Sequence, residues 1–120
     1  MTHEETLWEF SLGRIRVAWS VSPDYGYRYD GDDEDGEIQS KLDSGEYVAF
    51  DSAMRVYIDG HELGTDYLVG SVYDDPRKFR DHIGSQGKWG SYFTGMVHAS
   101  IAEARKELAR LQSFRLRDAA

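Results

Sequence analysis

The sequence contains no cysteine, only two prolines and no long uninterrupted run of apolar residues. The absence of cysteine excludes disulfides, thiolate metal ligands and cysteine nucleophiles. A membrane-spanning helix needs roughly 20 mainly apolar residues, and no stretch approaches that length. The N-terminal residues are acidic where a secretory signal would be basic. We therefore expect a protein with no membrane segment that is soluble and cytoplasmic.

Basic residues are also scarce, because 14 lysines and arginines stand against 22 acidic residues and give a formal net charge of −8. The imbalance is greatest between residues 23 and 46, where nine acids accompany two bases. Binding to nucleic acid depends on basic side chains that neutralise phosphates, so the composition argues against direct nucleic-acid binding. An acidic surface instead suits a protein or protein complex with a basic surface.

At 120 residues, the chain is expected to form a single domain over residues 1–120. The predicted fold class is α+β, with an antiparallel sheet of about three to five strands packed against a long C-terminal helix. Residues 46–59 alternate apolar and mixed side chains, which predicts the central strand. A bulge or break at Asp51-Ser52 is left open, and Asp59-Gly60 predicts a tight turn after the strand.

Residues 7–12 and 14–21 alternate as well and predict two strands that pair with the central strand. They form either a hairpin that turns near Gly13 or one long strand with a bulge there. After the predicted central strand, residues 61–64 suit a short strand, and residues 67–73 an edge strand or an irregular packed segment.

Three tyrosines alternate after the second predicted strand and suit a short strand with one aromatic face: Tyr25, Tyr27 and Tyr29. The very polar stretch over residues 30–37 predicts an exposed acidic loop. Ile38 and Leu42 are four residues apart, which predicts a short amphipathic turn before the central strand.

Two helices are predicted in the C-terminal half. Asp75-Pro76 combines a preferred N-cap with a residue suited to the first turn, so we expect a short helix near 76–83 with Phe79 and Ile83 inward. Ser91 is expected to cap a long helix that runs to about Gln112, followed by a frayed tail over residues 113–120. Steps of three and four residues give this helix one apolar stripe, widened by two neighbours: Phe93, Val97, Ile101, Ala104, Leu108 and Leu111, with Tyr92 and Met96.

Sequence motifs for catalysis or cofactor binding are missing. An EF-hand reading that starts at Asp30 fails, because its sixth position is Asp35 where glycine is required and its twelfth is Lys41. The glycine-rich stretch over residues 84–90 lacks the Gly-Lys-Ser/Thr of a phosphate-binding loop. The four histidines do not have the spacing of a helical zinc site. We therefore predict no catalytic residues, no metal site and no cofactor.

The residues that we assign to partner binding are the acids of the loop and the two tyrosines beside it: Asp30, Asp32, Asp33, Glu34, Asp35, Glu37, Tyr27 and Tyr29. Tyrosine is enriched at protein interfaces because it buries a large area at a low entropic cost. The favoured hypothesis is a small acidic protein-binding module that docks on a basic nucleic-acid-binding site of a host protein complex. Its narrowest version is an inhibitor of phage or mobile-element type, similar in role to anti-CRISPR or anti-restriction proteins. Neutralising Asp32, Asp33, Glu34 and Asp35 should then abolish binding and leave the fold intact.

Two other function classes remain open. A small enzyme or ligand-binding domain would need a pocket between sheet and helix, which we would place near Tyr57, His61 and residues 84–90. A homo-oligomeric structural or accessory protein would use an exposed sheet edge or an aromatic patch. The sequence is compatible with a monomer or a homodimer.

Overall fold

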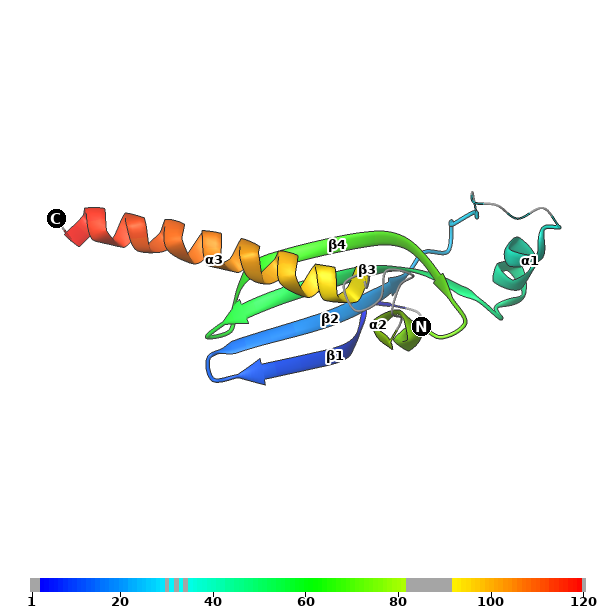
Figure 1. The fold of residues 1–120 in the computed structure, drawn as a ribbon, viewed down its shortest axis with the longest axis horizontal. Helices are drawn as coiled ribbons and strands as arrows, with labels where there is room; N and C mark the ends of the chain where they lie inside the picture. The colour runs from blue at the N-terminus through cyan, green and yellow to red at the C-terminus, as the bar shows by residue number, and fades with distance from the viewer. Residues whose placement is uncertain (1–2, 30, 32, 34, 82–91, 120) are drawn as a thin grey trace.

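The computed structural model describes residues 3–29, 31, 33, 35–81 and 92–119, and it confirms the α+β class (Figure 1). Four antiparallel strands form one sheet in the order β1-β2-β3-β4, and a long C-terminal helix packs on one face. The elements in chain order are β1 (Glu5–Leu12), β2 (Ile15–Pro23), α1 (Glu37–Ser44), β3 (Val48–Ile58), β4 (His61–Tyr73), α2 (Arg77–Asp81) and α3 (Tyr92–Ala119).

Both tight turns of the sheet lie where the sequence predicts them. β1 and β2 form a hairpin around Gly13, whose φ of 59° is the left-handed conformation that glycine tolerates. β3 and β4 are joined by Asp59 and Gly60, with φ values of 51° and 81°. Two consecutive left-handed residues are typical of a type I′ hairpin turn, which matches the twist of the flanking strands. The hairpin around Gly13 rules out the alternative of one long bulged strand.

β3 is the central strand, as predicted, and pairs with β2 on one side and β4 on the other. It begins at Val48 and ends at Ile58, slightly inside the predicted bounds of 46–59. The pairing with β4 is irregular opposite Asp51, where β4 contains the extra residue and Gly70 has a φ of 73°. The carboxylate of Asp51 accepts a hydrogen bond from the amide of Gly70 at 3.0 Å. Asp51-Ser52 is therefore opposite a bulge and does not break β3.

The core lies between α3, α2 and the near face of the sheet. Trp19, Phe50 and Met54 point into it from the strands and are fully buried, and Phe79 and Phe93 enter from the two helices. The first turn of α2 is capped as predicted, because the carboxylate of Asp75 accepts a hydrogen bond from the amide of Arg77 at 3.0 Å. The predicted inward position of Ile83 and the predicted cap at Ser91 lie outside the described residues.

Three local predictions are wrong. The tyrosines at positions 25, 27 and 29 do not form a strand, because the chain leaves the sheet after Pro23 and turns, with the amide of Tyr27 donating to the carbonyl of Asp24 at 3.3 Å. β4 is one strand of 13 residues where we expected two separate short segments, since bulges disguise its alternation. Glu37 belongs to the first turn of α1 and not to the preceding loop.

The long helix also differs from its prediction. α3 continues past Gln112 to Ala119, and its C-terminal part projects beyond the end of the sheet (Figure 1). Leu108 and Leu111 consequently have exposed fractions of 36% and 42%, although their spacing predicts core positions. Fraying of residues 113–120 stays a prediction. In the described part of the chain, none of the helices has the length and apolar character that a bilayer crossing requires.

Candidate partner-binding site

Most of the residues assigned to partner binding come together in one lobe at the end of the sheet. We call this the acidic lobe and define it as the described residues between Asp24 and Tyr47. The lobe is an excursion of the chain between β2 and β3, and it contains α1. In Figure 1, it lies at the opposite end of the molecule from the C-terminus of α3. Asp30, Asp32 and Glu34 of the predicted site lie outside the described residues.

Asp33 organises the start of α1. Its two carboxylate oxygens accept hydrogen bonds from the amides of Ile38 and Gln39, at 3.0 and 3.1 Å. Gly36, the residue before the helix, has a φ of 68° and no side chain that could cap these amides. The carboxylate of Asp33 therefore takes the role of an N-cap and is favourably placed near the positive end of the helix dipole. Both oxygens of this carboxylate are therefore used in hydrogen bonds that stabilise the start of α1.

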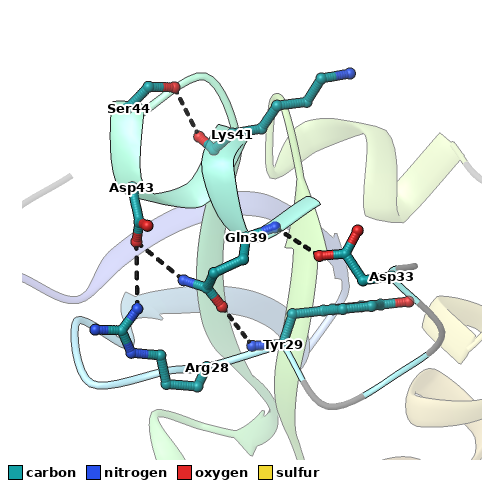
Figure 2. A network of polar contacts seen from close by, with 7 residues as sticks. All are labelled: Arg28, Tyr29, Asp33, Gln39, Lys41, Asp43 and Ser44. Carbon is teal, nitrogen blue, oxygen red and sulfur yellow. Dashed lines mark hydrogen bonds and ion pairs between the residues drawn. The ribbon is translucent and has the colours of Figure 1, made fainter. Parts of the chain in front are cut away.

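Gln39 connects α1 to the preceding segment (Figure 2). Its side-chain oxygen accepts a hydrogen bond from the amide of Tyr29 at 2.8 Å, and its side-chain nitrogen donates to Asp43 at 2.9 Å. Asp43 also forms an ion pair with Arg28, with 3.5 Å between the carboxylate oxygen Oδ1 and the guanidinium nitrogen Nη1. At the other end of α1, the hydroxyl of Ser44 donates to the carbonyl of Lys41 at 3.1 Å. These contacts join residues 28 and 29 to both ends of the short helix.

The three tyrosines that follow β2 occupy different environments. Tyr29 is half-buried, and its ring lies so close to Gly31 that a Cβ added there would stand 2.7 Å from a ring carbon. Tyr27 is also half-buried and approaches the backbone of Gly70 on β4. Tyr25, which sequence reasoning left out of the site, is 77% exposed. The period-two pattern groups the three tyrosines equally, so it gives no signal that Tyr25 is the most accessible one.

The negative charge on the lobe surface comes from Asp35, Glu37, Asp43 and Glu46, all exposed. Two bases partly compensate it: Arg28 contacts Asp43, and Lys41 lies 3.2 Å from Glu37. The hydrogen bond from Lys41 to Glu37 is the main reason why the pKa of Lys41 is raised. Sequence reasoning did not assign Asp43 and Glu46 to the site. The signal for both was present, since they belong to the acidic stretch over residues 23–46.

A cavity of about 620 Å³ lies at the base of the lobe, between the segment that follows β2 and α1. Its lining mixes aromatic, apolar and charged side chains, including Tyr25, Tyr27, Leu42, Asp43 and Tyr47. This position differs from the pocket expected between sheet and helix. Tyr57 and His61 lie on opposite faces of the sheet, because His61 pairs with Ile58, the neighbour of Tyr57. Tyr57 therefore cannot line a sheet–helix pocket, and residues 84–90 lie outside the described residues.

Two observations describe the titratable groups of the described residues. Among them, no three histidine, aspartate or glutamate side chains cluster closely enough to hold a metal ion. The resolved pKa shifts belong to members of ion pairs, such as the lowered pKa of Asp81 beside Arg80, and to Tyr73, whose pKa is raised by burial. No family model, no curated protein and no solved structure matches this chain.

Proposed function

We propose that this protein is a binding module whose acidic lobe docks on a basic surface of another protein or protein complex. The observation that carries the proposal is that four exposed acids lie on a lobe outside the core whose helix is held by internal hydrogen bonds. These acids are Asp35, Glu37, Asp43 and Glu46. A cluster of one sign attracts a surface of the opposite sign over a distance and discriminates against acidic competitors.

The hydrogen bonds within the lobe affect binding affinity, because a flexible loop loses conformational entropy when it binds. Each side chain or loop residue that is ordered only in the complex lowers the net affinity. In this lobe, Asp33 and Gln39 already fix α1 and the segment around Tyr29 through hydrogen bonds of 2.8–3.1 Å. The backbone that carries the exposed carboxylates of α1 is therefore already ordered before binding, which reduces the entropic cost of forming a complex.

The cavity at the base of the lobe supports a specific anchor for a basic partner. Tyr25 supplies an aromatic face in its lining, and Asp43 supplies a carboxylate that Arg28, which also lines the cavity, contacts at 3.5 Å. Arginine and lysine favour such surroundings, since a cation is attracted both by an aromatic face and by a carboxylate. An arginine or lysine of the partner is the side chain that this cavity would receive, in exchange for the contact that Arg28 makes with Asp43.

A nucleic-acid-binding site is the proposed type of basic surface. Such sites present lysine and arginine to phosphates, and carboxylates can occupy the same positions. The narrower version, an inhibitor of phage or mobile-element type, has the acidic charge as its only support. It predicts a more specific result, which is that nucleic acid and the acidic lobe compete for the same partner.

The test compares two triple variants of the full chain that remove the same amount of charge. The lobe variant carries Asp35→Asn, Glu37→Gln and Glu46→Gln, and the control carries three exposed acids changed outside the lobe: Glu5→Gln, Glu9→Gln and Glu103→Gln. Asp33 is excluded, because its carboxylate accepts the hydrogen bonds from Ile38 and Gln39 that cap α1, and its replacement would change the start of the helix as well as the charge. Each protein is immobilised and exposed to lysate of the native host at low and high salt, and bound proteins are quantified by mass spectrometry.

The proposal expects a salt-sensitive partner that the wild-type and control proteins capture and the lobe variant loses. Duplex DNA added to the lysate should release that partner if the lobe occupies a nucleic-acid-binding site. Equal losses in both triple variants would indicate a general charge effect and contradict docking through the lobe. If high salt releases the partner but DNA does not, the result supports docking on a basic surface and contradicts the proposal that this surface is a nucleic-acid-binding site.

A further inference from the structure

The two bases of the acidic lobe lie in different surroundings. Lys41 lies 3.2 Å from Glu37 and over the ring of Tyr47, with 5.0 Å between its Nζ atom and the ring centroid. Arg28 instead lines the cavity at the base of the lobe, where its Nη1 atom lies 3.5 Å from Oδ1 of Asp43. Arg28 is therefore the base that the lobe itself supplies to this cavity.

The contact between Arg28 and Asp43 is weak. Its length of 3.5 Å exceeds the roughly 2.7–3.2 Å of an ordinary N–H···O hydrogen bond. The two side chains have exposed fractions of 77% and 62%, so water competes for both charges. Ion pairs with this degree of exposure contribute little to stability. Arg28 can consequently leave Asp43 with little effect on the fold.

Asp43 is held in position independently of Arg28 (Figure 2). The side-chain nitrogen of Gln39, one turn earlier on α1, donates to Oδ1 of Asp43 at 2.9 Å. Gln39 is itself oriented, because its side-chain oxygen accepts a hydrogen bond from the amide of Tyr29 at 2.8 Å. Both contacts of Asp43 in Figure 2 go to Oδ1, and no described residue makes a hydrogen bond or ion pair with Oδ2. Oδ2 is therefore open to an incoming donor.

The lining of the cavity suits a guanidinium better than an ammonium. A guanidinium is planar and can donate to both oxygens of one carboxylate, whereas an ammonium acts as a point charge. Tyr25, which is 77% exposed, provides an aromatic ring of the kind on which a planar cation stacks. The half-buried Leu42 provides apolar surface for the methylene stem of an arginine. These features together favour arginine over lysine.

Resting on the function proposed above, we infer that the cavity selects an arginine of the partner over a lysine, and that Arg28 is a built-in competitor for this arginine. An incoming guanidinium that donates to both oxygens of Asp43 must displace Arg28 from Oδ1. A lysine ammonium needs only the open Oδ2, so it binds without displacing Arg28 and gains a single contact. Arg28 therefore weakens the binding of arginine and leaves the binding of lysine almost unchanged, apart from the general effect of its charge.

The test uses the full chain and two labelled peptides of equal charge, hexa-arginine and hexa-lysine, whose dissociation constants are measured by fluorescence anisotropy at low salt. The wild-type protein should bind hexa-arginine about threefold more tightly than hexa-lysine, and Arg28→Gln should widen this ratio to about tenfold. Lys41→Gln is the matched control, since it removes the same charge from the lobe at a residue that does not line the cavity. It should strengthen the binding of both peptides alike and leave the ratio unchanged.

A second pair of variants locates the site. Asp43→Asn should abolish the preference for hexa-arginine, because the amide keeps an acceptor for Gln39 but loses the charge and the second acceptor oxygen. Glu46→Gln removes the same charge elsewhere on the lobe and should keep the preference. A preference that survives Asp43→Asn, or the same ratio in Arg28→Gln and Lys41→Gln, would overturn the inference.

The wild-type result separates this inference from the proposed function. If the wild-type protein binds both peptides equally tightly, the preference for arginine is refuted, whereas docking on a basic surface stands. If it binds neither peptide, both the inference and the proposed docking on a basic surface are contradicted.

Discussion

The backbone of Gly64 on β4 lies directly against the backbone of α3 at Ser100. A Cβ added to Gly64 would overlap the carbonyl oxygen of Ser100 and stand 2.7 Å from the amide nitrogen of Ala104. The residues on the helix side are small as well, and the hydroxyl of Ser100 is satisfied by donating to the carbonyl of Val97 at 3.0 Å. Small side chains on both elements therefore set how closely the helix approaches the sheet.

Gly64→Ala is expected to lower the free energy of unfolding by about 1–3 kcal/mol, because the added methyl group must displace helix backbone and not a flexible side chain. The backbone conformation at position 64 is not left-handed, so the penalty comes from the contact alone. Urea denaturation followed by circular dichroism measures the change. Gly95→Ala is the control, since Gly95 lies in α3 with no atom within 4 Å of an added Cβ. That variant should gain about 0.5–1 kcal/mol from helix propensity, and similar results for the two variants would contradict the close approach.

Alternation predicted β1, β2 and β3 well, because these strands pair regularly over most of their length. β4 was harder to identify, since it contains extra residues at Leu63 and near Gly70 that shift its pattern twice. Each extra residue reverses the face on which the following side chains point. A period-two search therefore finds two short segments where the backbone forms one strand.

The limits of helical periodicity are clearest at Leu108 and Leu111. The spacing correctly groups them with Phe93 and Ala104 on one face of α3. Periodicity reports which residues share a face, but it carries no information about how far the opposing sheet extends. The same limit applies to the acidic lobe: composition located the charge, whereas the capping role of Asp33 depends on a backbone turn at Gly36 that no spacing rule predicts.

The short helix α2 should contribute far more stability than its five residues suggest. Phe79 is 2% exposed, and its ring centroid lies 5.7 Å from Trp19, 6.1 Å from Phe50, 6.0 Å from Tyr73 and 6.5 Å from Phe93. Phe79→Ala would leave a cavity among four aromatic rings, and we expect it to cost about 3–5 kcal/mol in chemical denaturation.

The control for this prediction is Phe10→Ala, which removes the same atoms from a side chain that is 52% exposed. It should cost about 1 kcal/mol or less in the monomer, because little area returns to water. A cost for Phe79→Ala no larger than that for Phe10→Ala would show that α2 does not anchor the core.

Asp33→Ala should loosen the start of α1 without unfolding the sheet. Two amides, those of Ile38 and Gln39, lose their acceptor, and the loss of an N-cap costs about 1 kcal/mol. Hydrogen exchange at these two amides should accelerate about fivefold, while exchange in β2 and β3 stays unchanged. Asp35→Ala is the matched control, because no described hydrogen bond of its side chain holds α1. Equal acceleration in both variants would indicate a charge effect on exchange and contradict the capping role.

The ion pair between the two hairpin turns predicts a dependence of stability on pH. The Nε atom of Arg14 donates to both carboxylate oxygens of Asp59, at 2.8 and 3.0 Å, and these hydrogen bonds hold the pKa of Asp59 below its ordinary value of 3.8. A carboxyl group whose pKa is lower in the folded state binds fewer protons there than in the unfolded state. The stabilisation is therefore fully present above about pH 3.8 and is lost as the pH falls through the lowered pKa.

Arg14→Gln should move the pKa of Asp59 back toward 3.8, which carbon-detected NMR titration of the carboxyl group measures directly. The difference in unfolding free energy between this variant and the wild type should shrink as the pH drops below that value, and it should also shrink in 1 M salt because the pair is exposed. Arg16→Gln is the control, since Arg16 pairs with Glu9 and leaves Asp59 untouched. A stability difference between wild type and Arg14→Gln that is the same at pH 7 and at pH 2 would contradict the pairing, because below pH 3.8 the unfolded state binds a proton at Asp59 more readily than the folded, paired state does.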